Sequence, residues 1–161
     1  MLNKKHLSNS EVKEINSQLN YLYHTEDAID KKDVAILEEN ILKVNNRSRF
    51  FYYAITDSTK IIVPTLKNIL ENIQLYEKLK KITVDIGAVR FIVSGADIMR
   101  PGIVDFSNGI NKDDVILIVD VNHKKPLAVG IMQFSGEDAK ALISGKIVKN
   151  VHYVGDKIWN S

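Results

Sequence analysis

The chain has 161 residues, 45% hydrophobic and 26% charged, a composition typical of folded proteins and a length that allows one domain or two small ones. Lysine and arginine total 22 against 20 aspartate and glutamate, so no basic surplus marks the chain as a nucleic-acid-binding protein. The absence of cysteine excludes thiolate metal sites, cysteine nucleophiles and disulfides.

Residues 1–76 show helix and strand patterns that together predict a small α+β domain. Ser8 and Glu11 have the spacing of a capping box, in which each side chain bonds a free backbone N–H at a helix start. Apolar residues then recur at helical spacing and predict a helix from Asn9 to about Tyr23, and a second helix is predicted from Thr65 to about Ile73. Between them, β-branched and aromatic residues predict strands at 34–37, 41–44, 49–56 and 60–63.

The sequence changes character after residues 77–81, a charged stretch with little periodicity that we interpret as the junction between two domains. All eight glycines lie beyond this stretch. Because glycine is used where the backbone needs positive φ or close approach, residues 77–161 are expected to contain tight turns and exposed backbone.

The β-branched runs of the second domain predict a small, mostly antiparallel barrel with short helices. Ser135 and Asp138 predict a capped helix that continues through Ile143 and ends at Gly145. A long hairpin and two short C-terminal strands are predicted at 115–121, 127–134, 147–148 and 151–154.

Patterns of catalytic and metal sites are absent from the sequence. The four histidines show neither His-x-His nor His-x-x-x-His spacing, and there is no Gly-x-Ser-x-Gly motif or phosphate-binding Gly-Lys-Ser/Thr. Neighbouring carboxylates such as Asp113 and Asp114 do not converge as acid–base chemistry requires. Asp85 is interpreted as a helix cap, with a catalytic role left open. We expect a protein that is not an enzyme and that holds no cofactor or metal.

Two features of the sequence bear on where in the cell the protein is located. No apolar run reaches the roughly 18 residues that a membrane-spanning helix needs. The first residues, Met1–Leu7, lack the apolar stretch of a secretory signal. A cytoplasmic protein without membrane association is therefore expected.

A series of motifs in residues 81–159 stands in a specific order. It consists of Val84–Ile92, Ser94–Ile103, Asp113–Val115, Pro126–Gly130, Ser135 with Asp138, Gly145-Lys146 and His152–Trp159. The series resembles the PUA domain, a module named for pseudouridine synthase and archaeosine transglycosylase. The resemblance implies a barrel-like fold that binds RNA and performs no chemistry itself.

Phe91–Met99 and His152-Tyr153 are most similar to the malignant-T-cell-amplified-sequence proteins and the related ligatin. Those proteins carry a small α+β pre-PUA domain before the PUA domain, which here implies a pre-PUA-like domain at 1–76 and a PUA domain at 77–161. The resemblance also implies a role in translation initiation, reinitiation or recycling at the small ribosomal subunit. Structured RNA (tRNA or rRNA) is the implied ligand, with a protein partner at the N-terminal domain, as the density-regulated protein is for the eukaryotic relatives.

The resemblance also implies the RNA-binding residues, because PUA domains hold RNA in a groove between the first helix, the glycine loop after it and the last strand. Arg100 is expected to present the main cation, and Arg100→Ala to weaken RNA binding without disturbing the fold. For the other residues of the set, a purely structural role is also open: the glycines as turn residues, the methionine as a core residue, the histidine as a buried strand residue and the lysines as ordinary surface residues. The implied set is Gly95, Ala96, Asp97, Met99, Arg100, Pro101, Gly102, Lys146, Lys149 and His152.

Two other functions remain possible from the sequence. The amphipathic helix and the aromatic strand of the N-terminal domain are compatible with a protein-interaction scaffold that binds no RNA. The chain is also compatible with an accessory subunit that delivers RNA to a separate tRNA- or rRNA-modifying enzyme, since no catalytic domain of such an enzyme fits in the 80 residues upstream.

Overall fold

The computed structural model describes residues 3–161, which form two compact units that divide between Lys78 and Leu79. None of the described helices is long and apolar enough to cross a membrane. The elements of the N-terminal unit are β1 (Lys4–His6), α1 (Asn9–Tyr23), β2 (Ala35–Glu38), β3 (Ile41–Val44), β4 (Arg47–Ala54), β5 (Lys60–Pro64), α2 (Leu66–Glu71) and α3 (Ile73–Lys78).

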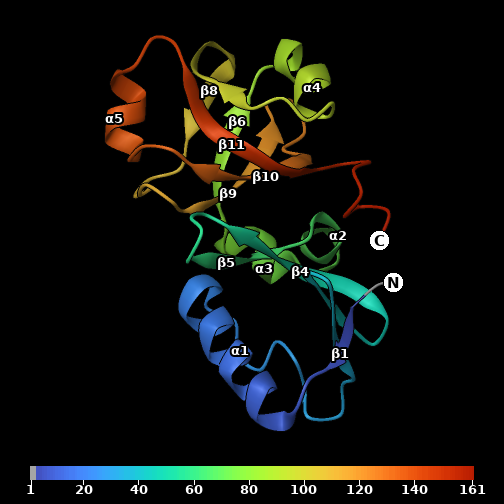
Figure 1. Ribbon diagram of the computed structural model, residues 1–161. Helices are drawn as coiled ribbons and strands as arrows, with labels where there is room; N and C mark the ends of the chain where they lie inside the picture. The colour runs from blue at the N-terminus through green and yellow to red at the C-terminus, as the bar shows by residue number, and fades with distance from the viewer. Residues whose placement is uncertain (1–2) are drawn as a thin grey trace. The chain divides into compact units, whose positions relative to one another are not determined.

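The N-terminal unit is a five-stranded antiparallel sheet, in the order β1-β2-β3-β4-β5, with α1 along one face (Figure 1). The predicted capping box is confirmed: the Ser8 hydroxyl accepts the Glu11 N–H, and the Glu11 carboxylate accepts the Ser8 N–H. Ile15, Leu19 and Tyr23 recur every fourth residue and are buried, so one face of α1 forms part of the core. The Tyr23 hydroxyl donates to the Ile62 carbonyl of β5 and so ties the end of the helix to the sheet.

Two predictions for the N-terminal unit need correction. The helix predicted from Thr65 to Ile73 ends at Glu71, and a separate helix, α3, follows from Ile73 to Lys78. Asn72 causes the break, because its side-chain oxygen accepts the Leu75 N–H and caps the second helix. β1 was not predicted, since its three residues are exposed and charged or polar and carry no apolar alternation.

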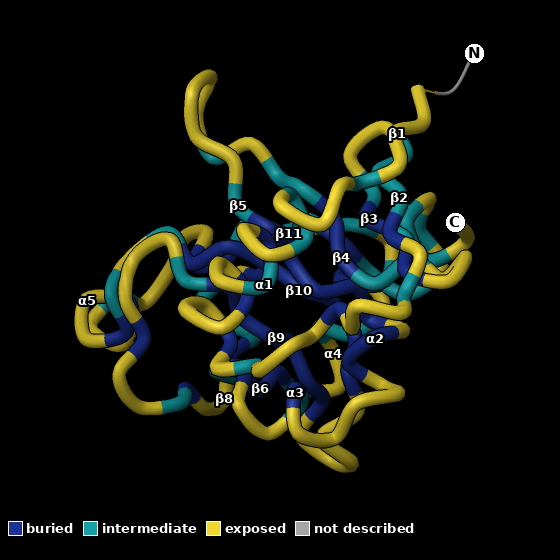
Figure 2. The backbone as a smooth tube through the Cα atoms, turned by 90° about the horizontal axis from the view of Figure 1, so that it is seen from below, coloured by how far each residue is buried: buried dark blue, intermediate teal, exposed yellow. Residues whose placement is uncertain are grey.

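The C-terminal unit is a six-stranded sheet that curls into a nearly closed barrel, in the order β7-β11-β10-β9-β6-β8. All its pairings are antiparallel except β6 with β9. Every residue of β9 and β10 is buried, which Figure 2 shows as the dark segments of the tube. The elements are β6 (Lys80–Val84), α4 (Ile86–Ile92), β7 (Ile98–Met99), a 3-10 turn η1 (Arg100–Gly102), β8 (Ile103–Phe106), β9 (Val115–Asp120), β10 (Pro126–Met132), α5 (Gly136–Ala141) and β11 (Lys146–Tyr153).

The predicted hairpin β9–β10 and the Ser135 cap of α5 are confirmed, the latter by the Asp138 N–H donated to the Ser135 hydroxyl at 3.1 Å. The end of α5 is corrected: the helix stops at Ala141, and Ile143 is 90% exposed instead of forming part of an apolar stripe. The last two predicted strands are also corrected, because β11 is one continuous strand of eight residues.

Candidate nucleic-acid interface

A groove of about 450 Å³ lies in the C-terminal unit beside α4. Carbon dominates its walls, and two of its apolar side chains are unusually open, with Phe91 54% and Met99 48% exposed. Exposed apolar side chains gathered in a groove are more typical of a binding site than of the rest of a protein surface. The lining residues come from α4, the loop after it, β7 and η1, and are Asp85, Gly87, Ala88, Phe91, Ile92, Ala96, Asp97, Ile98, Met99, Pro101 and Gly102.

Local backbone chemistry explains how the groove walls are placed. The Asp85 side chain accepts the Ala88 N–H at 3.0 Å and caps α4, so the helix-cap interpretation of Asp85 is confirmed. Gly95 has φ +98°, and a Cβ there would lie only 3.0 Å from the Tyr153 ring. Gly95 is therefore required both for the turn after α4 and for the close approach of β11.

Asn150 in β11 holds the loop that forms one wall of the groove. Its side-chain amide donates to the carbonyls of Ile92 and Ala96, both at 3.0 Å, and its backbone N–H donates to Asp97 at 2.9 Å. The side chain is 9% exposed, so these bonds are shielded from water. Sequence reasoning missed Asn150, and only an unexplained polar residue inside a β-branched strand could have indicated it.

Lys146 and Lys149 meet at the carboxylate of Asp97. The Lys146 Nζ lies 3.7 Å from Oδ2 and the Lys149 Nζ 3.6 Å from Oδ1. Residues three apart normally point to opposite faces of a strand, but the pairing of β11 with β7 shifts register between Lys146 and Val148. Ile147 and Val148 are accordingly both buried, and the two ammonium groups lie on the same side.

Arg100 makes contacts within the C-terminal unit that the sequence did not indicate, and its role as an RNA-binding cation stays a prediction. Its guanidinium donates to the carbonyls of Ile103 at 3.3 Å and Lys140 at 3.4 Å, and lies 5.3 Å from the centre of the Phe106 ring. Its Nε is buried without a hydrogen-bond partner in residues 3–161. The side chain therefore ties η1 to β8 and α5.

Arg100→Ala is expected to lower the free energy of unfolding by about 1–2 kcal/mol, because two carbonyl bonds and a cation–π contact are lost. This replaces the expectation that the fold stays intact. Chemical denaturation of the wild type, Arg100→Ala and Arg100→Lys measures the effect. Arg100→Lys keeps the charge but not the planar contacts, so wild-type stability in Arg100→Lys would show that charge alone matters.

His152 also needs correction, since its side chain is completely buried and its ring cannot reach RNA across the groove. Val148, Asn150 and His152 alternate along β11 and all face inward. The His152 Nδ1 lies 2.9 Å from both oxygens of Asp156, which also accepts the backbone N–H groups of Tyr153 and Trp159. His152 thus anchors the C-terminal turn.

Asp156→Ala is expected to cost about 2 kcal/mol of stability, because it leaves a buried histidine and backbone donors without their acceptor. Burial raises the pKa of Asp156, but the His152 bond and the Trp159 and Tyr153 N–H groups outweigh it and hold the pKa below the usual 3.8. The contribution is therefore fully present above pH 3.8 and is lost as the pH falls through the lowered pKa. Thermal melts of wild type and variant from pH 6 into the acid range should show a difference that narrows as the pH falls; a constant difference would contradict this assignment.

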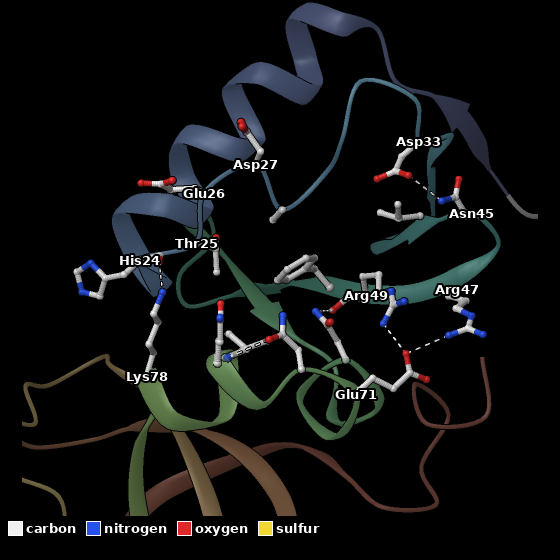
Figure 3. Close-up of a pocket in the computed structure, with 17 residues that line it drawn as sticks. His24, Thr25, Glu26, Asp27, Asp33, Asn45, Arg47, Arg49, Glu71 and Lys78 are labelled. Carbon is white, nitrogen blue, oxygen red and sulfur yellow. Dashed lines mark hydrogen bonds and ion pairs between the residues drawn. The ribbon is translucent and has the colours of Figure 1, made fainter.

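The N-terminal unit contains a second, larger cavity of about 850 Å³ with polar walls, shown in Figure 3. Arg47 and Arg49 both donate to one oxygen of Glu71, and Lys78 donates to the His24 carbonyl at 2.5 Å. The Arg49 bond and the charges of both arginines hold the pKa of Glu71 below its usual value. These bonds, at 3.1, 2.7 and 2.5 Å, are shorter than the contacts of Lys146 and Lys149 to Asp97 at 3.7 and 3.6 Å, so the cations of the cavity are held more tightly. The cavity is therefore a weaker candidate than the groove.

No group of three or more histidine and carboxylate side chains in residues 3–161 is placed to hold a metal ion. The site thus consists of the apolar groove, Asp97 and the two lysines. Among the expected site residues, Gly95, Ala96, Asp97, Met99, Pro101 and Gly102 form or border the groove and Lys146 and Lys149 stand beside it. Such a surface can stack flat apolar groups and neutralise phosphates, and proteins that bind single-stranded RNA use both interactions.

Comparison with known proteins identifies the fold as that of a family. The PUA domain model matches residues 80–154. An uncharacterized protein of Methanocaldococcus jannaschii is 41% identical over 145 residues, which cover 81% of this chain and 88% of the relative. A hypothetical protein from Pyrococcus horikoshii has a crystal structure with a TM-score of 0.78 and 34% identity, and the match covers 98% of each chain. The chain belongs to the family of PUA-domain proteins.

Relatives with descriptive names show which PUA-domain proteins this chain is similar to. Translation machinery-associated protein 20 of Schizosaccharomyces pombe is 26% identical over 132 residues, covering 77% of this chain and 73% of the relative. Malignant T-cell-amplified sequence 1 of Danio rerio is 35% identical over 80 residues, covering 48% of this chain and 44% of the relative. The predicted resemblance to PUA proteins of the translation machinery is confirmed.

Proposed function

We propose that this chain is a non-catalytic RNA-binding protein of the cytoplasm that acts in translation on the small ribosomal subunit or on tRNA. The apolar groove with Lys146 and Lys149 beside it is the observation that carries the proposal, because it combines a stacking surface with two cations. The translation-associated names of the relatives support the context. The C-terminal domain holds the RNA, and the pre-PUA-like N-terminal domain contacts a protein partner.

Sedimentation of cell lysate through a sucrose gradient tests the cellular context. The chain is expected to co-sediment with small ribosomal subunits, and nuclease treatment of the peak should release it. Co-purification with a tRNA- or rRNA-modifying enzyme would instead support the accessory-subunit alternative. Recovery of one stoichiometric protein together with a failure to crosslink to RNA would support the interaction scaffold and contradict the proposal.

A further inference from the structure

The charge inside the groove is of the opposite sign to that of the lysines beside it. Asp85 and Asp97 contribute carboxylates to the lining, and within residues 3–161 no lysine or arginine lines the groove. A phosphate placed in this space would meet carbon and two like charges. The backbone of a bound RNA therefore belongs outside the groove, near Lys146 and Lys149, and a different part of the nucleotide belongs inside.

A nucleobase is compatible with these apolar walls, whereas a phosphate is not. The exposed side chains of Phe91 and Met99 offer apolar surface. An unpaired base is stabilised when its faces leave water and stack on such groups. Arg90 lies 4.7 Å from the centre of the Phe91 ring and holds it by a cation–π contact. The groove volume of about 450 Å³ falls within the usual range of sites for small ligands.

The carboxylate of Asp97 is held in a fixed orientation at the groove wall. Oδ1 accepts the Asn150 N–H at 2.9 Å, while Oδ2 makes a long 3.7 Å contact to Lys146. The Asp97 side chain is 24% exposed, so it is partly desolvated yet accessible. Asp85 differs, because it already accepts the Ala88 N–H as a helix cap.

We infer that Asp97 determines base specificity in this groove by accepting hydrogen bonds from an unpaired base that carries an amino group, guanine above all. An ionised carboxylate only accepts hydrogen bonds, and it can take two parallel N–H groups. The Watson–Crick edge of guanine offers N1–H and the N2 amino group side by side. Cytosine and adenine each offer one amino group, and uracil has a single N–H between two carbonyl oxygens that a carboxylate repels. This inference rests on the proposed function.

A set of four RNA hairpins tests the inference. Each carries the same stem and a short oligouridine 3′ overhang, in which one nucleotide is G, A, C or U. Wild type is expected to bind the G hairpin about tenfold more tightly than the U hairpin, in the lower part of the range for a bidentate base contact. In Asp97→Asn this ratio should fall to about twofold or less, while binding to the U hairpin strengthens because the two lysines lose their internal partner.

Asp105→Asn is the control, since it removes the same charge from an exposed position in β8 that does not line the groove. It should keep the wild-type preference for G. Equal affinity of wild type for G and U, or an unchanged preference in Asp97→Asn, would overturn the inference and leave the proposed function standing. Failure of wild type to bind any of the hairpins would overturn both.

Discussion

Gly130→Ala is expected to destabilise the C-terminal unit by about 3 kcal/mol, at the upper end of the range for overpacking a core. Gly130 lies in β10 where the pairing with β11 shifts register. A Cβ at this position would lie 2.3 Å from the Val148 Cγ1 and 2.7 Å from the Lys149 carbonyl oxygen. The Lys149 carbonyl is part of the β11 backbone, so it cannot move without disturbing the β10–β11 pairing, and the Val148 side chain is completely buried and has little room to turn away.

Gly87→Ala is the matched control for this substitution. Gly87 lies in α4, and the nearest atom to its Cβ would be an Asp85 oxygen at 3.5 Å, an ordinary contact. Alanine in a helix is favoured over glycine, so this variant should be as stable as wild type or slightly more stable. Urea denaturation of both variants measures the difference. A Gly130→Ala protein within about 0.5 kcal/mol of wild type would contradict the described β10–β11 packing.

The double substitution Lys146→Ala/Lys149→Ala is expected to weaken RNA binding about tenfold near 0.1 M salt and to reduce the dependence of affinity on salt. Each lysine that neutralises a phosphate contributes roughly 0.7–0.9 to the slope of log affinity against log salt, so the slope should fall by about 1.5. Stability should change little, because both side chains are substantially exposed and surface ion pairs contribute little.

Lys112→Ala/Lys125→Ala provides the control with the same change in net charge. Both residues are exposed, and neither lines the groove. Filter binding at two or more salt concentrations compares the two double variants. If the control lowers affinity and slope as much as the groove variant does, RNA binding depends on net charge, and the lysines beside Asp97 have no special role.

The sequence predicted the elements that depend on local chemistry. Ser8, Asp85 and Ser135 are helix caps as expected, because a cap depends only on a side chain and the backbone within three residues of it. The β9–β10 hairpin followed from β-branched runs around a turn. The groove itself followed from the family resemblance and not from charge, which is nearly balanced in the chain.

The roles of particular side chains were harder to predict, because they depend on tertiary contacts. The Arg-Pro turn indicated an exposed cation at Arg100, but the guanidinium contacts the Phe106 ring and donates to the carbonyls of Ile103, three residues on, and of the distant Lys140. The alternation of a strand already places Lys149 and His152 on opposite faces, so the burial of His152 was available from the sequence. The register shift that brings Lys146 to the same side as Lys149 was not, since no residue pattern marks it.

The central claim is that the C-terminal groove holds RNA, and photo-crosslinking tests it most directly. A hairpin RNA with 4-thiouridine in its overhang is irradiated with the full chain, and the crosslinked peptides are identified by mass spectrometry. We predict crosslinks within residues 86–102 and 146–149, and their loss when unlabelled RNA competes. Crosslinks confined to residues 3–78 would contradict the account, because they would place RNA on the N-terminal unit.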